Sequence, residues 1–197
     1  MIEINERISV LQSSEEPVLS ADVYVIKGDR FSYIVDVGSN DEAFTLVKSI
    51  PNKKIVITHF HEDHTDNLRR LDIPDEDIYV GGYTRKYTGK GTEVKEKIVI
   101  EDGVKIVIAP LPNSHAKGSL CVTVGDEYLI IGDAFYSSSK GYSVSLLGEE
   151  IKTLKSLEFK EVLMSHKQRM HPREIVIGSL EKFFAQREKG IPYIPFG

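Results

Sequence analysis

Short apolar runs separated by turn residues dominate the start of the chain and predict β-strands. Residues 23–27 and 31–35 are rich in β-branched and aromatic side chains, and Gly28-Asp29 between them is typical of a hairpin turn. Residues 7–11 have the same character. We therefore expect three strands here, of which the last two form a hairpin.

A helix and a buried strand are expected next. Ser39 or Asn40 can cap a helix over residues 41–48, and Pro51 ends it because proline cannot continue the helical hydrogen bonds. The apolar, β-branched run at residues 55–57 then predicts a strand with both faces buried.

The rest of the chain continues as strands, hairpin turns and a few helices, with no linker and no reliable internal repeat. In chain order we expect a short helix at 67–71, a strand at 78–80, an irregular segment or short helix at 83–97, hairpins at 97–101 with 104–109 and at 120–124 with 128–131, a loop at 137–148, a helix at 149–157, a strand at 161–164 and an amphipathic helix at 172–188.

Composition is that of an ordinary globular protein. The chain has 197 residues, 41% of them hydrophobic and 28% charged, which suits a single domain over residues 1–197. The formal net charge of −5 lacks the basic footprint of a nucleic-acid-binding protein. Without a membrane-spanning run or a basic N-terminal leader, and with Cys121 as the single cysteine, we expect a cytoplasmic protein that does not bind membranes.

Four potential metal ligands follow the strand at residues 55–57: His59, His61, Asp63 and His64. Chance would produce this H-x-H-x-D-H spacing about once in several thousand chains of this length. Strand alternation directs His59 and His61 to the same side, so both can bind one cation. Asp63 and His64 follow where the chain must turn, into a helix, and can reach a second cation. The motif therefore predicts half of a two-metal site.

Three further residues each follow an apolar strand at the entrance to a loop: His115, Asp133 and His166. Taken singly, Asp133 after Gly132 fits a turn residue equally well, and either histidine fits an exposed loop. Together with the cluster they supply three histidines for one metal, and an aspartate with two histidines for the other, which leaves one carboxylate to bridge. His171, beside a proline, fits no ligand position.

These residues, in this order, resemble the metallo-β-lactamase superfamily. The resemblance rests on the motif at residues 59–64, on His115, on Gly132-Asp133 and on His166, and it includes the early Asp36-x-Gly38. It implies an α+β fold, a four-layer αββα sandwich of two mixed β-sheets flanked by helices, with the metals at one edge of the sheets. In that family the early aspartate braces the metal loop from a neighbouring strand.

The resemblance also implies a ligand set and a cofactor. Two divalent metal ions are expected, zinc first, although iron or manganese accept the same nitrogen and oxygen donors. Carried over residue by residue, the first metal would be held by His59, His61 and His115, the second by Asp63, His64 and His166, and Asp133 would bridge them.

Local departures leave the subfamily open. Many members have Thr-Pro-Gly-Ser where this chain has residues 116–119, Ala-Lys-Gly-Ser, and glycine where it has Asp66 and Ser165. True zinc β-lactamases often place cysteine at the position of Asp133, so β-lactams are not the expected substrates. An aspartate in the bridging position is similar to what the glyoxalase II-like thioesterase, lactonase and phosphodiesterase branches have there. Tyr136 is similar to the tyrosine that assists the carbonyl in acyl-homoserine lactonases, and a packing aromatic is its alternative role.

The expected function is hydrolysis of a small ester-type substrate, such as a thioester or lactone, by hydroxide held between two metals. Asp63 would orient the nucleophile and carry its proton. A net positive pocket favours an anionic substrate.

The alternative is a mononuclear iron persulfide dioxygenase that uses His59, His61 or His115 with Asp133. Flavodiiron chemistry fits poorly because that branch has glutamate at the position of His61, a nuclease is disfavoured by the acidic charge, and the oligomeric state stays open.

Overall fold

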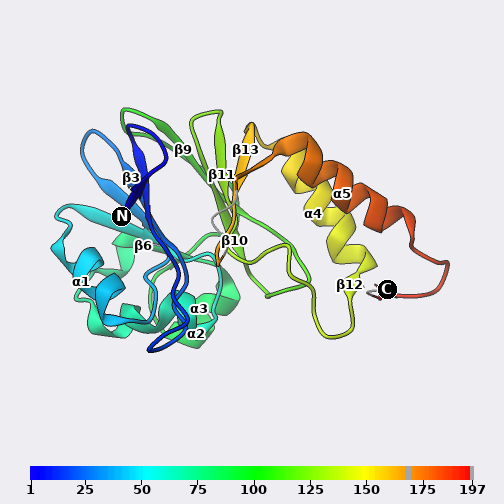
Figure 1. Ribbon diagram of the computed structural model, residues 1–197, viewed down its shortest axis with the longest axis horizontal. Coiled ribbons are helices and arrows are strands. Elements are labelled where there is room, and N and C mark those ends of the chain that lie inside the picture. Colours follow the sequence, from blue (N-terminus) through cyan, green and yellow to red (C-terminus); the bar gives the residue numbers. More distant parts are fainter. Residues whose placement is uncertain (167–169, 196–197) are drawn as a thin grey trace.

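The computed structural model describes residues 1–166 and 170–195. Its strands form two large sheets, with helices on the outer face of each, so that the sheets face one another across the middle of the molecule (Figure 1). Among the helices of the described residues, none is long and apolar enough to cross a membrane.

The first sheet contains seven strands in sequential order and is mixed. Its first four strands are antiparallel, and the last four, from β4 onward, are parallel. The strands expected at 7–11, 23–27, 31–35 and 78–80 are confirmed, and the strand expected at 55–57 begins earlier. The bounds are β1 (Ile2–Glu3), β2 (Ile8–Leu11), β3 (Val23–Lys27), β4 (Ser32–Val35), β5 (Lys53–Val56), β6 (Ile78–Val80) and β7 (Thr92–Glu93).

The second sheet contains six strands in the order β14-β13-β11-β10-β9-β8. All neighbours are antiparallel except β11 and β13, so this sheet is mixed as well. Both predicted hairpins are present. The bounds are β8 (Ile98–Glu101), β9 (Lys105–Pro110), β10 (Leu120–Val124), β11 (Tyr128–Ile130), β13 (Glu161–Leu163) and β14 (Met170–Pro172).

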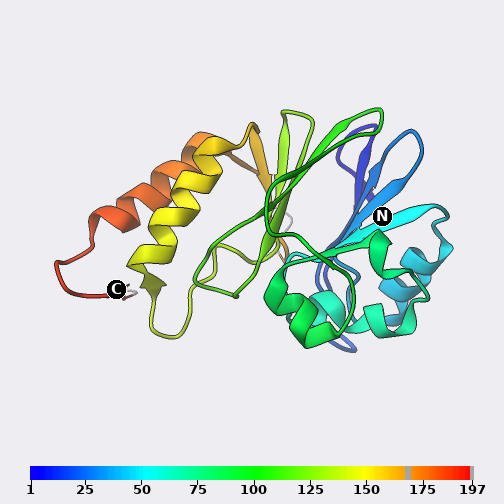
Figure 2. The ribbon, with the colours of Figure 1, turned by 180° about the vertical axis from the view of Figure 1, so that it is seen from behind.

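The helices divide between the two sheets, as both views show (Figures 1 and 2). Helices α1 to α3 and two 3₁₀ turns cover the first sheet, and α4 and α5 cover the second. Asn40 caps α1 as predicted, because its side chain accepts a hydrogen bond from the Ala43 amide at 2.8 Å. The bounds are α1 (Asp41–Ser49), α2 (Glu62–Thr65), η1 (Asp66–Arg70), η2 (Asp75–Asp77), α3 (Gly82–Thr88), α4 (Val144–Ser156) and α5 (Arg173–Ala185).

Strand alternation builds three apolar layers from these elements. In β4, Tyr33 and Val35 point between the sheets, whereas Ile34 points to the outer layer with α1. In β10, Val122 points between the sheets and Cys121 towards α4 and α5. One apolar layer therefore lies between the sheets and one under each set of helices, which confirms the predicted αββα sandwich.

The expected loop at 137–148 is wrong in part. Helix α4 begins at Val144 rather than Glu149, and the preceding residues form β12 (Tyr142–Ser143). This short strand pairs with β15 (Tyr193–Ile194) near the end of the chain, where Tyr142 faces Ile194. The serines and glycine of this segment suggested a loop because their true partner is some fifty positions away in the sequence and leaves no local signal.

Glu150 is an unusual feature of the α4 interface. It is fully buried, and neither of its carboxyl oxygens has a hydrogen-bond partner within the described part of the chain. Burial raises the pKa of Glu150 from 4.5 to about 9. The folded state therefore holds a proton that the unfolded chain releases above pH 4.5, and Glu150 makes the fold less stable as the pH rises from about 4.5 to about 9.

We expect Glu150→Met to raise the free energy of unfolding at pH 8 by on the order of 2 kcal/mol, because it removes a buried, unpaired acid. The gain should be much smaller at pH 5, where the wild-type carboxyl is protonated more readily in both states. Urea titrations at the two pH values measure this difference. The control is Glu149→Met, at an exposed glutamate paired with Lys152, which should change stability by less than about 0.5 kcal/mol. Equal effects of Glu150→Met at both pH values would contradict the assignment.

Candidate metal centre

The histidine motif lies where β5 ends and α2 begins. Strand β5 ends at Val56. His61 is the residue that precedes α2, and its backbone is extended, with a φ of −65° and a ψ of 147°. Asp63 and His64 then lie inside the four-residue helix. The turn into a helix that the sequence predicted is therefore present, and it separates the motif into two pairs of side chains.

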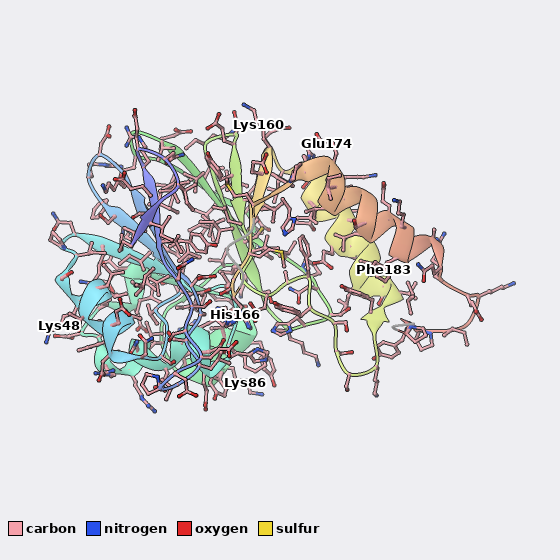
Figure 3. The ribbon with its side chains drawn as sticks, viewed as in Figure 1. Lys48, Lys86, Lys160, His166, Glu174 and Phe183 are labelled. Atoms are coloured by element: carbon pink, nitrogen blue, oxygen red, sulfur yellow. The ribbon has the colours of Figure 1, made fainter. Side chains whose placement is uncertain are left out.

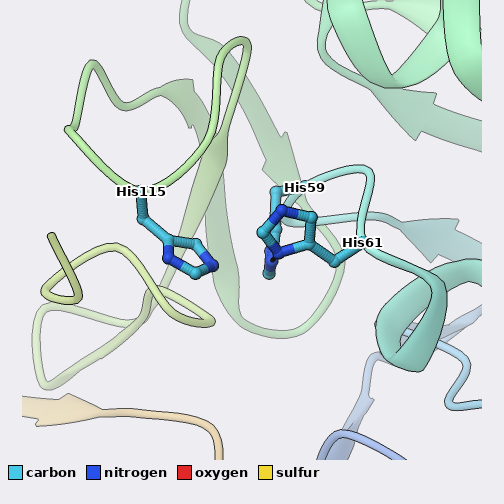
Figure 4. Close-up of side chains that lie close together, drawn as sticks. All are labelled: His59, His61 and His115. Atoms are coloured by element: carbon cyan, nitrogen blue, oxygen red, sulfur yellow. Dashed lines mark hydrogen bonds between the residues drawn. The ribbon is translucent and has the colours of Figure 1, made fainter. Parts of the chain in front are cut away.

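The first group consists of three histidines from two loops that point toward one another (Figure 4). His59 Nε2 lies 3.0 Å from His61 Nδ1. The ring of His115 lies 5.0 Å from that of His59 and 4.7 Å from that of His61, measured between centroids. Their potential ligand atoms all fall within 4.8 Å of one another, a spacing suited to a single cation.

The second group consists of Asp63, His64, Asp133 and His166. His166 Nε2 lies 3.0 Å from Asp63 Oδ2 and 3.5 Å from Asp133 Oδ2. His64 Nε2 is 3.5 Å from the same Asp133 oxygen. His166 comes from the loop after β13, and Figure 3 places it near the lower ends of the two sheets, where the other strand-end loops gather.

Asp133 lies between the two groups. Its Oδ2 atom is 3.6 Å from His115 Nε2 of the first group as well as 3.5 Å from the two histidines of the second. The preceding Gly132 has a φ of +56°, and a Cβ there would come within 2.4 Å of Thr58 Oγ1. Glycine is therefore required for the loop of Asp133 to approach the histidine motif so closely.

Among the described residues, three buried potential ligand atoms at this site make no hydrogen bond of good geometry: His64 Nε2, His115 Nε2 and Asp133 Oδ1. Leaving polar atoms buried and unpaired is unfavourable by about 1–3 kcal/mol each, so such atoms call for a ligand. Imidazole nitrogens and a carboxylate oxygen suit a divalent cation such as zinc, iron or manganese. The residues present therefore fit one cation in each group.

The two groups differ in protonation. Burial lowers the pKa of His59, His61 and His115, so these three imidazoles are neutral at pH 7 and ready to bind a cation. Burial also disfavours a charge on His64, but the carboxylates of Asp36 and Asp133 outweigh it and raise the pKa of His64 to about 10. Cation binding by His64 must therefore displace a proton.

The pKa of His166 is raised by neighbouring carboxylates, as that of His64 is. Its hydrogen bonds to Asp133 and Asp63 raise the pKa of His166 to about 9, so it too gives up a proton when a cation binds. Burial alone would raise the pKa of Asp133, but the neighbouring imidazoles of His166 and His64, each 3.5 Å from Asp133 Oδ2, hold that pKa well below its ordinary value. Asp133 is therefore ionised at neutral pH.

Asp36 holds the motif in place. Its carboxylate accepts hydrogen bonds from the Thr58 amide and hydroxyl, both at 2.7 Å, and lies 2.7 Å from His64 Nδ1. The contact directs Nδ1 of His64 away from the site and leaves Nε2 facing it. Asp36 itself has a φ of +62°, a region that aspartate and asparagine tolerate better than most residues. The bracing aspartate that the family resemblance implied is present.

A second set of contacts, which the sequence analysis missed, holds the loop of His166. The Tyr24 hydroxyl donates to the Met164 carbonyl at 2.7 Å, and the Asp22 amide donates to Ser165 Oγ at 3.0 Å. The backbone of His166 in turn lies beside the buried Asp22 carboxylate, and His166 has a φ of +62°. Residues before and in β3 therefore fix an otherwise unfavourable backbone, although 143 positions separate Asp22 from Ser165.

The loop of His115 is ordered by its own asparagine, another residue that the sequence analysis did not single out. The Asn113 side-chain oxygen accepts hydrogen bonds from the amides of His115 and Ala116, both at 3.0 Å, in a compact Asx turn. An asparagine two positions before a candidate ligand histidine is the local signal that could have identified it.

The two remaining predicted positions behave differently. Tyr136 shares a turn with Asp133, because its amide donates to the Asp133 carbonyl at 2.9 Å, and its ring centroid lies 5.8 Å from that of His115. It therefore borders the first group, and its catalytic role stays a prediction. His171, expected not to be a ligand, lies in β14 opposite Val162 and belongs to neither group.

We expect Asp36→Asn to weaken divalent metal binding about 10- to 100-fold while the chain still folds, because asparagine tolerates the same backbone angles but cannot accept every hydrogen bond that the carboxylate accepts. Competition with a chromophoric chelator measures the affinity, and circular dichroism checks the fold. The matched control is Asp41→Asn, at an exposed aspartate paired with Arg70, which should leave the affinity unchanged. Equal affinities for wild type and Asp36→Asn would remove Asp36 from the support of the site.

Neither sequence comparison identifies a relative, because no protein-family model and no curated protein matches the chain. Solved structures do match. A metallo-β-lactamase from Pontibacter korlensis is 16% identical, with 94% of this chain and 98% of that chain covered and a TM-score of 0.69. An archaeal metallo-β-lactamase superfamily protein from Sulfolobus tokodaii is 19% identical, with 98% and 92% covered and a TM-score of 0.63.

A longer protein shares the same fold. The rubredoxin:oxygen oxidoreductase of Desulfovibrio gigas is 12% identical, with 95% of this chain but 62% of that chain covered and a TM-score of 0.72. At these identities the likeness concerns the fold, and it agrees with the fold that the family resemblance implied. The chain therefore has the metallo-β-lactamase fold.

Proposed function

We propose that this protein is a metal-dependent hydrolase of small ester-type substrates, such as thioesters or lactones. The observation that carries the proposal is the convergence of seven nitrogen and oxygen donors in two groups that meet at Asp133. We propose His59, His61 and His115 as ligands of one cation, Asp63, His64 and His166 as ligands of a second, and Asp133 as the bridge. Zinc is the first choice of metal.

When bound, a pair of divalent cations activates water as a nucleophile at neutral pH and polarises the carbonyl oxygen of an ester. The protein's own side chains position the reacting groups and transfer protons. Burial would raise the pKa of Asp63, but its hydrogen bond to His166 and the charge of His64 hold it below the ordinary value. Asp63 is therefore ionised near neutral pH, and its carboxylate can accept a proton from water and pass it to the leaving group.

The nature of the substrate follows from charge and size. A pocket that holds two divalent cations against Asp63 and Asp133 stays net positive, which favours an anionic small molecule. The formal net charge of −5 gives no support to nucleic acid as a partner. We further propose a cytoplasmic location, for which the support is composition alone, including the free and buried Cys121.

A second candidate is oxidation chemistry at one iron, as in a persulfide dioxygenase. It is favoured by the nitrogen and oxygen donors, which iron accepts as readily as zinc, and by the fold shared with an oxidoreductase. The ligands in that case would be drawn from the first histidine group together with Asp133. The metal that copurifies with the protein separates the two proposals.

We expect about two zinc or manganese ions per chain by elemental mass spectrometry, and thioester or lactone hydrolysis that is lost on chelation and restored by metal. Asp63→Asn should lower this hydrolysis about 100-fold or more while the fold is retained. The matched control Asp66→Asn changes a neighbouring aspartate paired with Arg69 and should have little effect. One iron per chain would favour the dioxygenase, and near-normal turnover by Asp63→Asn would exclude its proposed role.

We expect Tyr136→Phe to lower kcat on lactones about 10-fold if the hydroxyl of Tyr136 assists the carbonyl, since one hydrogen bond to developing charge contributes about 1.4 kcal/mol or more. Metal content and the fold should not change. Steady-state kinetics on a lactone and a thioester measure the effect. Unchanged kcat on both substrates would leave Tyr136 as an aromatic packed beside His115.

A further inference from the structure

A cavity of about 350 Å³ adjoins the metal centre on the side of His115. This volume lies within the range of small-molecule sites in proteins. Its lining is part apolar, from Phe60, Tyr83, Leu146 and Tyr193, and the remainder includes Lys117. Phe60 lies between His59 and His61 in the motif, so one wall of the cavity is continuous with the first group of histidines.

The walls of the cavity are held by contacts between segments distant in the sequence. A Cβ at Gly81 would come within 1.7 Å of the Gly118 carbonyl oxygen, so the start of α3 and the loop of His115 meet backbone to backbone. This contact sets Tyr83 against Phe60, with ring centroids 4.9 Å apart. An aromatic surface therefore lies beside the candidate metal ligands.

Another part of the cavity lining comes from strand β15, through Tyr193. In the short sheet of β12 and β15, Ser143 faces Tyr193. The Ser143 amide also donates to Ser114 Oγ at 2.9 Å, which joins this sheet to the loop of His115. Residues 142–143, which were expected to lie in a loop, therefore pair with β15 and bring Tyr193 to the cavity.

Lys117 provides the charge. It is exposed at the cavity, and among the described residues no hydrogen bond or ion pair engages its ammonium group. Apart from the titratable His115, it is the one ionisable cation among the described lining residues, and no carboxylate is among them. A ligand that fills the cavity would therefore meet an aromatic surface and an unpaired positive charge.

We propose that this cavity selects substrates with a flat apolar or aromatic group that carries a carboxylate remote from the scissile bond, and that Lys117 pairs with this carboxylate. The inference rests on the proposed ester hydrolysis for its reaction but not for its ligand binding. Lys117 is then a specificity-determining residue, and Tyr83 contributes the aromatic contact. Neither side chain takes part in bond cleavage.

Benzoate and terephthalate are matched probes for this pocket. Both carry one carboxylate that the metal centre can attract, and terephthalate has a second at the far end of the ring. Isothermal titration of the metal-loaded protein should give about fivefold tighter binding of terephthalate, and the preference should weaken as salt is raised because the lysine is exposed. Lys117→Met should abolish the preference, and Lys117→Arg should restore it.

Two controls isolate the residues. Lys86→Met removes another exposed lysine, on the neighbouring α3, and should leave the preference intact. Tyr83→Ala should weaken both ligands about 3- to 10-fold, whereas Tyr87→Ala, whose ring also contacts Phe60 but does not line the cavity, should not. Equal affinities of the two probes for the wild type, or an unchanged preference in Lys117→Met, would overturn the proposal.

A kinetic arm separates the pocket from the proposed function. We expect the protein to hydrolyse an aryl thioester with a remote carboxylate at a higher kcat/KM than its uncharged analogue, and Lys117→Met to raise KM for the charged thioester alone. Hydrolysis of neither thioester would count against the proposed reaction, and the probe affinities would still decide the pocket. Hydrolysis of both with equal kcat/KM by wild type and Lys117→Met would reject the pocket and retain the reaction.

Discussion

The buried carboxylate of Asp36 is the interaction on which the site depends most. It lies directly after β4, in a left-handed conformation, and binds both the Thr58 backbone and the His64 ring. These contacts join two parallel neighbours of the first sheet at their carboxyl ends. Because a buried polar group is unfavourable unless it is hydrogen-bonded, the carboxyl group of Asp36, the threonine and the histidine hold one another in a single arrangement.

The packing of the two sheets against each other brings the remaining loops of the site together. An apolar layer between them aligns the strand ends, so that loops from β5 and β6 on one sheet and β9, β11 and β13 on the other open at one edge. Contacts from Asp22 and Tyr24 then connect the first sheet to the loop of His166. Candidate ligands separated by more than a hundred positions thus share a site because the sheets, not the loops themselves, set the distances.

The same edge combines two chemical characters. Nitrogen and oxygen donor atoms form a polar centre, and an aromatic cavity with one lysine in its lining adjoins it. The first character suits a cation, and the second is the basis of the proposed substrate selectivity. In these proposals, bond cleavage and selectivity belong to different residues.

The sequence by itself predicted most of the strands, because alternation and turn residues are local, and four of the seven candidate donors, because H-x-H-x-D-H is a local motif. It also identified Asp36, through resemblance. Only the tertiary structure decided the pairing of β12 with β15, the support of His166 by Asp22 and the cavity beside Lys117. Each of these three features joins residues that are far apart in the chain. The residues involved form no periodic pattern and no motif of fixed spacing. Such contacts form only when the packing of whole sheets brings their segments together, so no local signal precedes them.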